Sequence, residues 1–227
     1  MNAATTVQSA PAIAVKLKKS QTVFNMFIDD KDVWATCPTD YLWIYDKLIL
    51  ARKLGYLAAP AGIAVPKPNW YIVRPITNIR MMSRGASKMW LTPQDTDLVP
   101  DGSFWCECFE GRHTSVDFHY SIQELAVEGF RDNPNRLDRF SRWERIEERY
   151  KFPEVLGELW RLTPWINVEY IDGKIIEVHL RWNDDFSNHN SDIIYPVWRD
   201  NPMLQPINTT WYASASGDRL GFWIVNK

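Results

Sequence analysis

The sequence predicts an α+β unit built on antiparallel strands. Three observations predict this class. Short β-rich runs come in pairs joined by turn signals, helical patterns separate those pairs, and strands do not alternate regularly with helices as in a doubly wound sheet. The chain has 227 residues, of which 45% are hydrophobic and 24% charged, so it is long enough to bury a sizeable core.

The N-terminal part is predicted to begin with a mobile tail over residues 1–21. A β-rich run, TVFNMFID, follows at 22–29. Thr39 can cap a helix whose pattern lasts until Gly55, because a hydroxyl accepts from free backbone N–H groups and glycine suits the residue after a helix. The connector at 58–69 is rich in proline and glycine, and WYIVRPI then predicts a strand.

The C-terminal part predicts two hairpins and two helices. SFWCECF and HTSVDFHY flank the turn Glu110-Gly111, which predicts a hairpin over 103–120. Residues 121–150 are charged with an apolar stripe at helical spacing, and Pro153 opens a second helical run. The turn Asp172-Gly173 predicts a hairpin of 166–171 with 174–182. We expect 186–227 to pack back, which gives one unit over 22–227 with lobes at 22–100 and 101–227.

Composition excludes several function classes. The net charge of −2 argues against nucleic acid and an anionic membrane surface as partners. No apolar run approaches the roughly 20 residues that span a bilayer. Three cysteines are too few for a disulfide framework and favour a reducing, cytoplasmic compartment. The twelve tryptophans are an excess that would suit a surface for a protein partner if several were exposed.

The polar residues along the chain suit a nucleoside triphosphate. Lys47 and Arg74 come first, and carboxylates follow in the later strands, ending with IIEVHLRWN at 175–183. Lysine and arginine neutralise phosphate oxygens, while paired carboxylates hold Mg²⁺, which prefers oxygen ligands. The sequence has no nucleophile elbow, P-loop or G-x-G-x-x-G motif, which excludes the common alternatives that depend on them.

Residues 46–183 resemble the ATP-grasp superfamily of carboxylate–amine ligases. DKLILARKLGYLAAP resembles the family's Asp-Lys helix and the connector after it, and WYIVRPI resembles its phosphate-contacting strand. FWCECFEGRHTSVDF is similar to the segment whose linker contacts adenine and ribose. INVEYIDGKIIEVHLRW resembles the segment whose acids bind Mg²⁺ and whose arginine approaches the γ-phosphate.

The resemblance implies an ATP-grasp-like fold and a role for each matched residue. It implies an ATP- and Mg²⁺-dependent ligase that activates a small-molecule or peptide carboxylate as an acylphosphate for attack by an amine or thiol. The implied roles are catalysis by Arg74 and Arg181, nucleotide contacts by Lys47, Arg74, Glu107, Glu110 and Asp117, and metal binding by Glu169, Glu177 and His179.

Three departures from the family pattern keep a second hypothesis open. The glycine-rich lid is reduced to RMMSRGAS, His179 stands where the family has asparagine, and the N-terminal substrate domain is mostly missing. Imidazole is a poor ligand for Mg²⁺. The alternative is therefore a non-catalytic nucleotide-binding or structural protein on this fold. A viral source would suit so trimmed a chain and would place it in the host cytoplasm.

Hairpin geometry leaves open whether Glu169 and Glu177 can share a metal. A two-residue turn at Asp172-Gly173 pairs residue 169 with 176, which puts the two acids on opposite faces. A three-residue loop pairs 169 with 175 and puts both acids on one face. The sequence is compatible with both.

Overall fold

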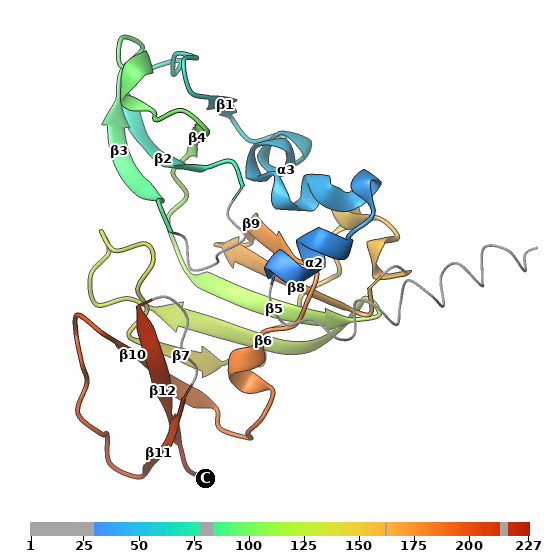
Figure 1. Ribbon diagram of the computed structural model, residues 1–227, viewed down its shortest axis with the longest axis vertical. Coiled ribbons are helices and arrows are strands. Elements are labelled where there is room, and N and C mark those ends of the chain that lie inside the picture. The colour runs from blue at the N-terminus through green and yellow to red at the C-terminus, as the bar shows by residue number, and fades with distance from the viewer. Residues whose placement is uncertain (1–29, 78–83, 162, 214–217) are drawn as a thin grey trace, which may run out of the picture.

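The computed structural model describes residues 30–77, 84–161, 163–213 and 218–227. Two antiparallel sheets dominate it, as Figure 1 shows, and the predicted α+β class is confirmed. The predictions for 1–21, for 22–29 and for the first half of the reduced lid, residues 80–83, lie outside the described residues.

The smaller sheet has the strand order β1-β4-β2-β3 and is formed before residue 108. Its hydrophobic core lies on one face, where Tyr71, Val73, Leu91 and Trp105 pack together. Its strands are β1 (Ala58–Pro60), β2 (Asn69–Pro75), β3 (Ser87–Leu91) and β4 (Ser103–Glu107).

The larger sheet has the order β11-β12-β10-β7-β6-β5-β8-β9. Its strands are β5 (His113–His119), β6 (Ile122–Phe130), β7 (Arg142–Arg145), β8 (Trp165–Ile171), β9 (Lys174–His179), β10 (Ile193–Trp198), β11 (Thr209–Tyr212) and β12 (Arg219–Val225). The C-terminal strands extend the sheet beyond β7, so the tail at 186–227 does pack back onto the unit.

The helices are short, and one α-helix and one 3₁₀ turn contact the edge strand β9 (Figure 1). The α-helices are α2 (Asp30–Thr36) and α3 (Lys47–Lys53). The 3₁₀ turns are η1 (Thr39–Tyr45), η2 (Thr96–Leu98), η3 (Glu154–Leu156), η4 (Leu159–Arg161) and η5 (Asp184–Phe186). The largest core cluster joins α2, η1 and α3 to β5, β8 and β9.

Two predicted helices are not helices in the structure. Residues 121–150 form β6 and β7, whose strand pairing overrides the helical spacing of the apolar residues. In the second predicted helix, over 153–162, the described residues 153–161 form the turns η3 and η4, since Gly157 has a φ of 51° that interrupts the run. The helix predicted from Thr39 is divided at Asp46, whose carboxylate accepts from the Ile49 N–H at 2.8 Å and starts α3.

The predicted hairpin over 103–120 is wrong, because β4 and β5 belong to different sheets. β4 pairs with β1 and β2, and β5 pairs with β6 and β8. The linker 108–112 between them turns from one sheet to the other. Gly111 has a φ of 125°, and a Cβ there would lie 2.7 Å from the Asp172 Cβ, so glycine lets the linker approach the β8–β9 turn. The division into lobes at residue 100 stays a prediction.

Candidate functional site

The β8–β9 hairpin answers the question that the sequence left open. Asp172 and Gly173 have φ values of 48° and 76°, which is the two-residue type I′ turn. A β-bulge then inserts Ile176, so Glu169 pairs directly with Glu177. Both acids therefore lie on one face of the sheet despite the short turn.

A row of polar side chains follows that face across β5, β8 and β9. Ser115 pairs with Glu169, Asp117 with Asn167, and Asn167 with His179, so these residues point to the same side. The polar row consists of His113, Ser115, Asp117, Asn167, Glu169, Glu177 and His179, with Arg181 two residues further on. All of them except Glu169 are buried, whereas the Glu169 side chain is 23% exposed.

Lys47 enters the polar row from α3. Its Nζ lies 2.6 Å from Glu177 Oε1, and both side chains are only 6% exposed. The Lys47 N–H also donates to the Ile76 carbonyl just after β2, which fixes the start of the helix. The predicted phosphate lysine and one predicted metal ligand are thus brought together as a buried ion pair.

His179 is held by carboxylates on both sides. Its Nδ1 lies 2.9 Å from Asp30 Oδ2, and its Nε2 lies 3.6 Å from Glu177 Oε1 and 3.7 Å from Glu169 Oε1. Burial lowers the pKa of His179, but attraction to Asp30 outweighs it and raises the pKa to about 9. The ring therefore serves as a cation and donor in this arrangement, and its predicted role as a metal ligand stays a prediction.

Glu169 receives hydrogen bonds from two histidines. Arg131 Nη2 donates to His113 Nδ1 at 3.1 Å, which places the ring proton on Nε2, and His113 Nε2 then donates to Glu169 Oε2 at 3.1 Å. Burial opposes ionisation of Glu169, but the bonds from His113 and His179 outweigh it and hold its pKa well below the usual range. Glu169 is therefore a fixed anion that remains open to solvent.

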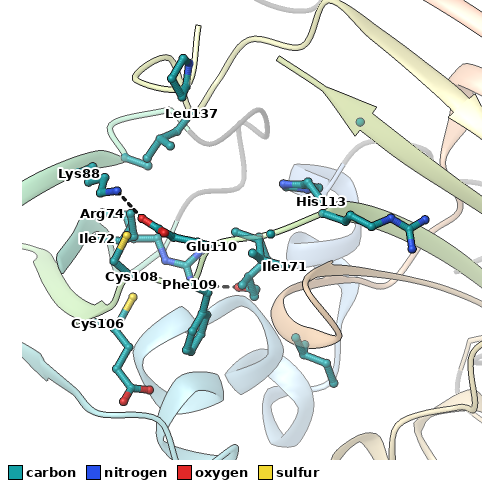
Figure 2. Close-up of a pocket in the computed structure, with 18 of the residues that line it drawn as sticks. Ile72, Arg74, Lys88, Cys106, Cys108, Phe109, Glu110, His113, Leu137 and Ile171 are labelled. Carbon is teal, nitrogen blue, oxygen red and sulfur yellow. Dashed lines mark hydrogen bonds and ion pairs between the residues drawn. The ribbon is translucent and has the colours of Figure 1, made fainter. Parts of the chain in front are cut away.

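A cavity of about 610 Å³ lies between the two sheets and reaches the polar row at His113. Apolar side chains such as Ile72, Phe109 and Ile175 line much of it, and Glu107 and Glu110 line it beside the linker. Figure 2 shows Lys88 from β3 reaching Glu110, with an Nζ to Oε1 distance of 2.8 Å.

Three arginines among the described residues line this inter-sheet cavity. Arg112 is paired with Glu128 and Glu148, whereas Arg74 and Arg131 bind backbone carbonyls. Arg74 Nη2 donates to the Ile176 carbonyl at 2.9 Å, and Arg131 Nη2 donates to the Leu137 carbonyl at 3.1 Å. Within the described parts of the chain, neither has a carboxylate at ion-pair distance, and the Nε of each is buried without a hydrogen-bond partner. Burial lowers the pKa of Arg131 to about 10, so it stays charged at neutral pH.

The predicted site residues fall into two groups. Arg74, Glu107 and Glu110 line the inter-sheet cavity, whereas Lys47, Asp117, Glu169, Glu177, His179 and Arg181 belong to the polar row or contact it. Burial raises the pKa of Asp117 to about 6, although the hydrogen bonds that it accepts from Asn167 and from the Asn183 N–H act in the opposite direction. Sequence reasoning missed Asp30, His113 and Arg131, although the shared alternation of His113 and Asp117 on one strand was a usable signal.

The arrangement could hold a cation only with help from a ligand. Across the described residues, no group of three or more His, Cys, Asp or Glu side chains could hold a metal ion by itself. The directly opposed Glu169 and Glu177 nevertheless offer the oxygen donors that Mg²⁺ uses when phosphates complete its coordination. No helix among the described residues is long and apolar enough to cross a membrane.

Comparison with solved structures identifies the fold. N5-carboxyaminoimidazole synthetase from Staphylococcus aureus has a TM-score of 0.53 at 9% identity, with 80% of this chain and 67% of that chain covered. An ATP-grasp superfamily protein from Archaeoglobus fulgidus has a TM-score of 0.46 at 17% identity, with 81% of this chain and 64% of that chain covered. L-amino acid ligase from Bacillus licheniformis has a TM-score of 0.48 at 11% identity, with 74% of this chain and 53% of that chain covered.

At the level of the fold, the chain is therefore similar to the Staphylococcus aureus synthetase, and its mixed α+β architecture matches that of the ATP-grasp-like structures to which the sequence motifs pointed. The chain spans between about half and two thirds of the length of these three structures. No protein-family model and no curated protein matches the sequence.

Proposed function

We propose that this protein binds ATP in the inter-sheet cavity, with Mg²⁺, and activates a carboxylate as an acylphosphate for attack by an amine or thiol. The observation that carries the proposal is the pair of guanidinium groups, Arg74 and Arg131, that line one cavity without a carboxylate at ion-pair distance among the described residues. A charged group that lacks a partner inside the protein is well suited to an anionic ligand.

The shape and lining of the cavity support a nucleotide. Its volume of about 610 Å³ is in the range of small-molecule sites, and its apolar side can cover a base. Glu107, Glu110 and the linker 108–112 would contact the adenine and ribose. Arg74 would then meet the phosphates, and Arg131 would lie where the cavity reaches the polar row.

The polar row supplies groups that suit phosphoryl transfer. Glu169 and Glu177 would hold Mg²⁺ together with phosphate oxygens, and the bound ion would neutralise charge on the transferred group. His113 and His179 keep the Glu169 carboxylate ionised and oriented. Lys47 and Arg181 add positive charge on the other side of this pair, which favours a phosphate and an acceptor carboxylate meeting there.

A matched pair of measurements tests the proposal. Mg·ATP at 100 times its dissociation constant should raise the unfolding free energy by about 2.7 kcal/mol. Release of phosphate on adding candidate carboxylates and amines should be abolished by Glu177→Gln and retained by Glu154→Gln, since Glu154 is exposed and remote. The absence of a thermal shift at millimolar Mg·ATP would contradict the proposal.

The second candidate is a non-catalytic nucleotide-binding or structural protein. The Lys47–Glu177 ion pair favours it, because a buried lysine at 2.6 Å occupies the carboxylate that a metal would need. Under this hypothesis ATP binds equally well with Mg²⁺ or with a chelator, and no substrate mixture releases phosphate. Calorimetry in both conditions separates the two candidates.

A further inference from the structure

Asp30 contacts the polar row from a distant part of the chain. It is the first residue of α2, is fully buried, and its Oδ2 accepts from His179 Nδ1 at 2.9 Å and from Arg181 Nη2 at 3.1 Å. Burial raises the pKa of Asp30, but attraction to the two cations outweighs it and keeps the carboxyl ionised. A carboxylate brought by α2 thus occupies the space in front of His179 and Arg181.

The fit between Asp30 and Arg181 is incomplete. Asp30 Oδ1 is buried without a hydrogen-bond partner, and so is Arg181 Nε, within the part of the chain that the structure describes. Arginine commonly binds a carboxylate through two parallel hydrogen bonds, one to each oxygen. Here a single oxygen serves both cations, so a carboxylate that approached Arg181 side-on would satisfy a donor that Asp30 leaves free.

The position of this carboxylate matters for the reaction. His179 links it to the metal-binding pair, because the other nitrogen of the same ring lies within 3.7 Å of Glu169 and Glu177. A carboxylate at the place of Asp30 is therefore one imidazole ring away from the proposed phosphate position.

We propose that His179 and Arg181 form a binding site for the acceptor carboxylate, and that Asp30 occupies this site as a tethered stand-in which the acceptor must displace. The inference rests on the proposed function for the identity of the acceptor, while the carboxylate site itself rests on the contacts above. Because a tethered group acts at a high effective concentration, Asp30 would weaken the binding of free carboxylates. Displacement would also move α2 away from β9.

Succinate is a suitable probe, and Asp30→Asn is the first variant. Asparagine keeps the shape of the side chain and removes its charge. Succinate should therefore bind Asp30→Asn at least about tenfold more tightly than it binds the wild type. Asp40→Asn, an exposed aspartate on η1, is the matched control and should bind as the wild type does. Equal affinity of wild type and folded Asp30→Asn, or no binding to either, would overturn the proposal.

A measurement on the wild type covers the case in which Asp30→Asn fails to fold. Saturating succinate should increase deuterium uptake in the segment Asp30–Thr36 and leave β10 and β12 unchanged; unchanged uptake at α2 would overturn the proposal. Mg·ATP binding is recorded in parallel on the same proteins. If ATP binds and the affinity for succinate is the same in wild type and Asp30→Asn, only the Asp30 proposal fails. If ATP does not bind, the proposed function fails.

Discussion

Arg74 and Arg131 in the inter-sheet cavity have no carboxylate at ion-pair distance among the described residues, whereas Lys47, His179 and Arg181 in the polar row each contact one. The two regions lie next to each other and meet at His113. In the polar row the chain supplies both signs of charge, so that region is stable by itself. In the cavity the chain supplies both signs of charge as well, but none of the lining carboxylates pairs with Arg74 or Arg131, so these two cations suit an anionic ligand. Changes in the polar row should therefore affect folding, and changes in the cavity should affect binding.

The largest expected effect comes from breaking the buried ion pair of the polar row. Lys47→Met leaves the buried Glu177 carboxylate with only the more distant His179 ring, at 3.6 Å, as a described cationic neighbour, which should lower the free energy of unfolding by up to about 3–5 kcal/mol. Urea denaturation measures the change. Arg52→Met on the exposed side of α3 is the control and should stay within about 0.5 kcal/mol of wild type. A small loss for Lys47→Met would mean that the polar row does not depend on this pair.

Asp117 should make the polar row sensitive to pH. Burial raises its pKa from 3.8 to about 6, so its contribution to stability is fully present below about pH 4 and is lost as the pH rises through 6. The stability difference between wild type and Asp117→Asn should fall by up to about 1.4 kcal/mol per pH unit within that window. Denaturation curves at closely spaced pH values test this. A difference that does not vary with pH would contradict the raised pKa.

Removing a cavity cation should affect the ligand more than the fold. Arg74→Met loses a charged contact worth about 1.5–3 kcal/mol, which raises the Kd for Mg·ATP about 10- to 100-fold. Arg74 bonds the Ile176 carbonyl and the Cys106 thiol and lies over the Phe104 ring, and none of these contacts is an ion pair, so stability should change less than binding. Calorimetry measures the Mg·ATP affinities of the wild type and of Arg74→Met, and Arg149→Met, at an exposed position, is the control. An unchanged Kd would place the phosphates elsewhere.

The smallest effect is expected at the mouth of the cavity. Lys88 and Glu110 form an exposed ion pair at 2.8 Å, and exposed pairs contribute about 0–1 kcal/mol. Lys88→Gln should leave the unfolding free energy almost unchanged, and its effect on Mg·ATP binding should decrease as salt is added. A large effect on stability would show that the pair holds the two sheets together.

The sequence predicted the strands near the site better than the connections between them. The alternation in WYIVRPI and the Asp172-Gly173 signal located β2 and the β8–β9 hairpin, because turn chemistry and period-two burial are local properties. β6 and β7 were missed because their strand pairing with distant partners outweighs a local helical pattern. Trp143 illustrates this, since its helical spacing from Ile146 suggested one face, yet the two residues pack into different clusters.

The site was predictable only where it depends on residues in one motif. Glu169, Glu177, His179 and Arg181 lie within the 166–182 segment and could be identified there. Asp30 lies 149 positions before His179, and no local pattern indicates that contact. The bulge at Ile176 was equally hidden, because it depends on how β9 fits β8 and on no turn residue.

The bulge at Ile176 has a consequence for motion between the sheets. An inserted residue leaves the ladder of its strand, and the carbonyl of Ile176 is used instead by Arg74 from the smaller sheet. This bond connects β2 to β9 across the inter-sheet cavity. A phosphate that drew the Arg74 guanidinium toward itself would take away that connection. Ligand entry and the release of one sheet from the other would then be the same event, with one arginine exchanging a carbonyl for a phosphate.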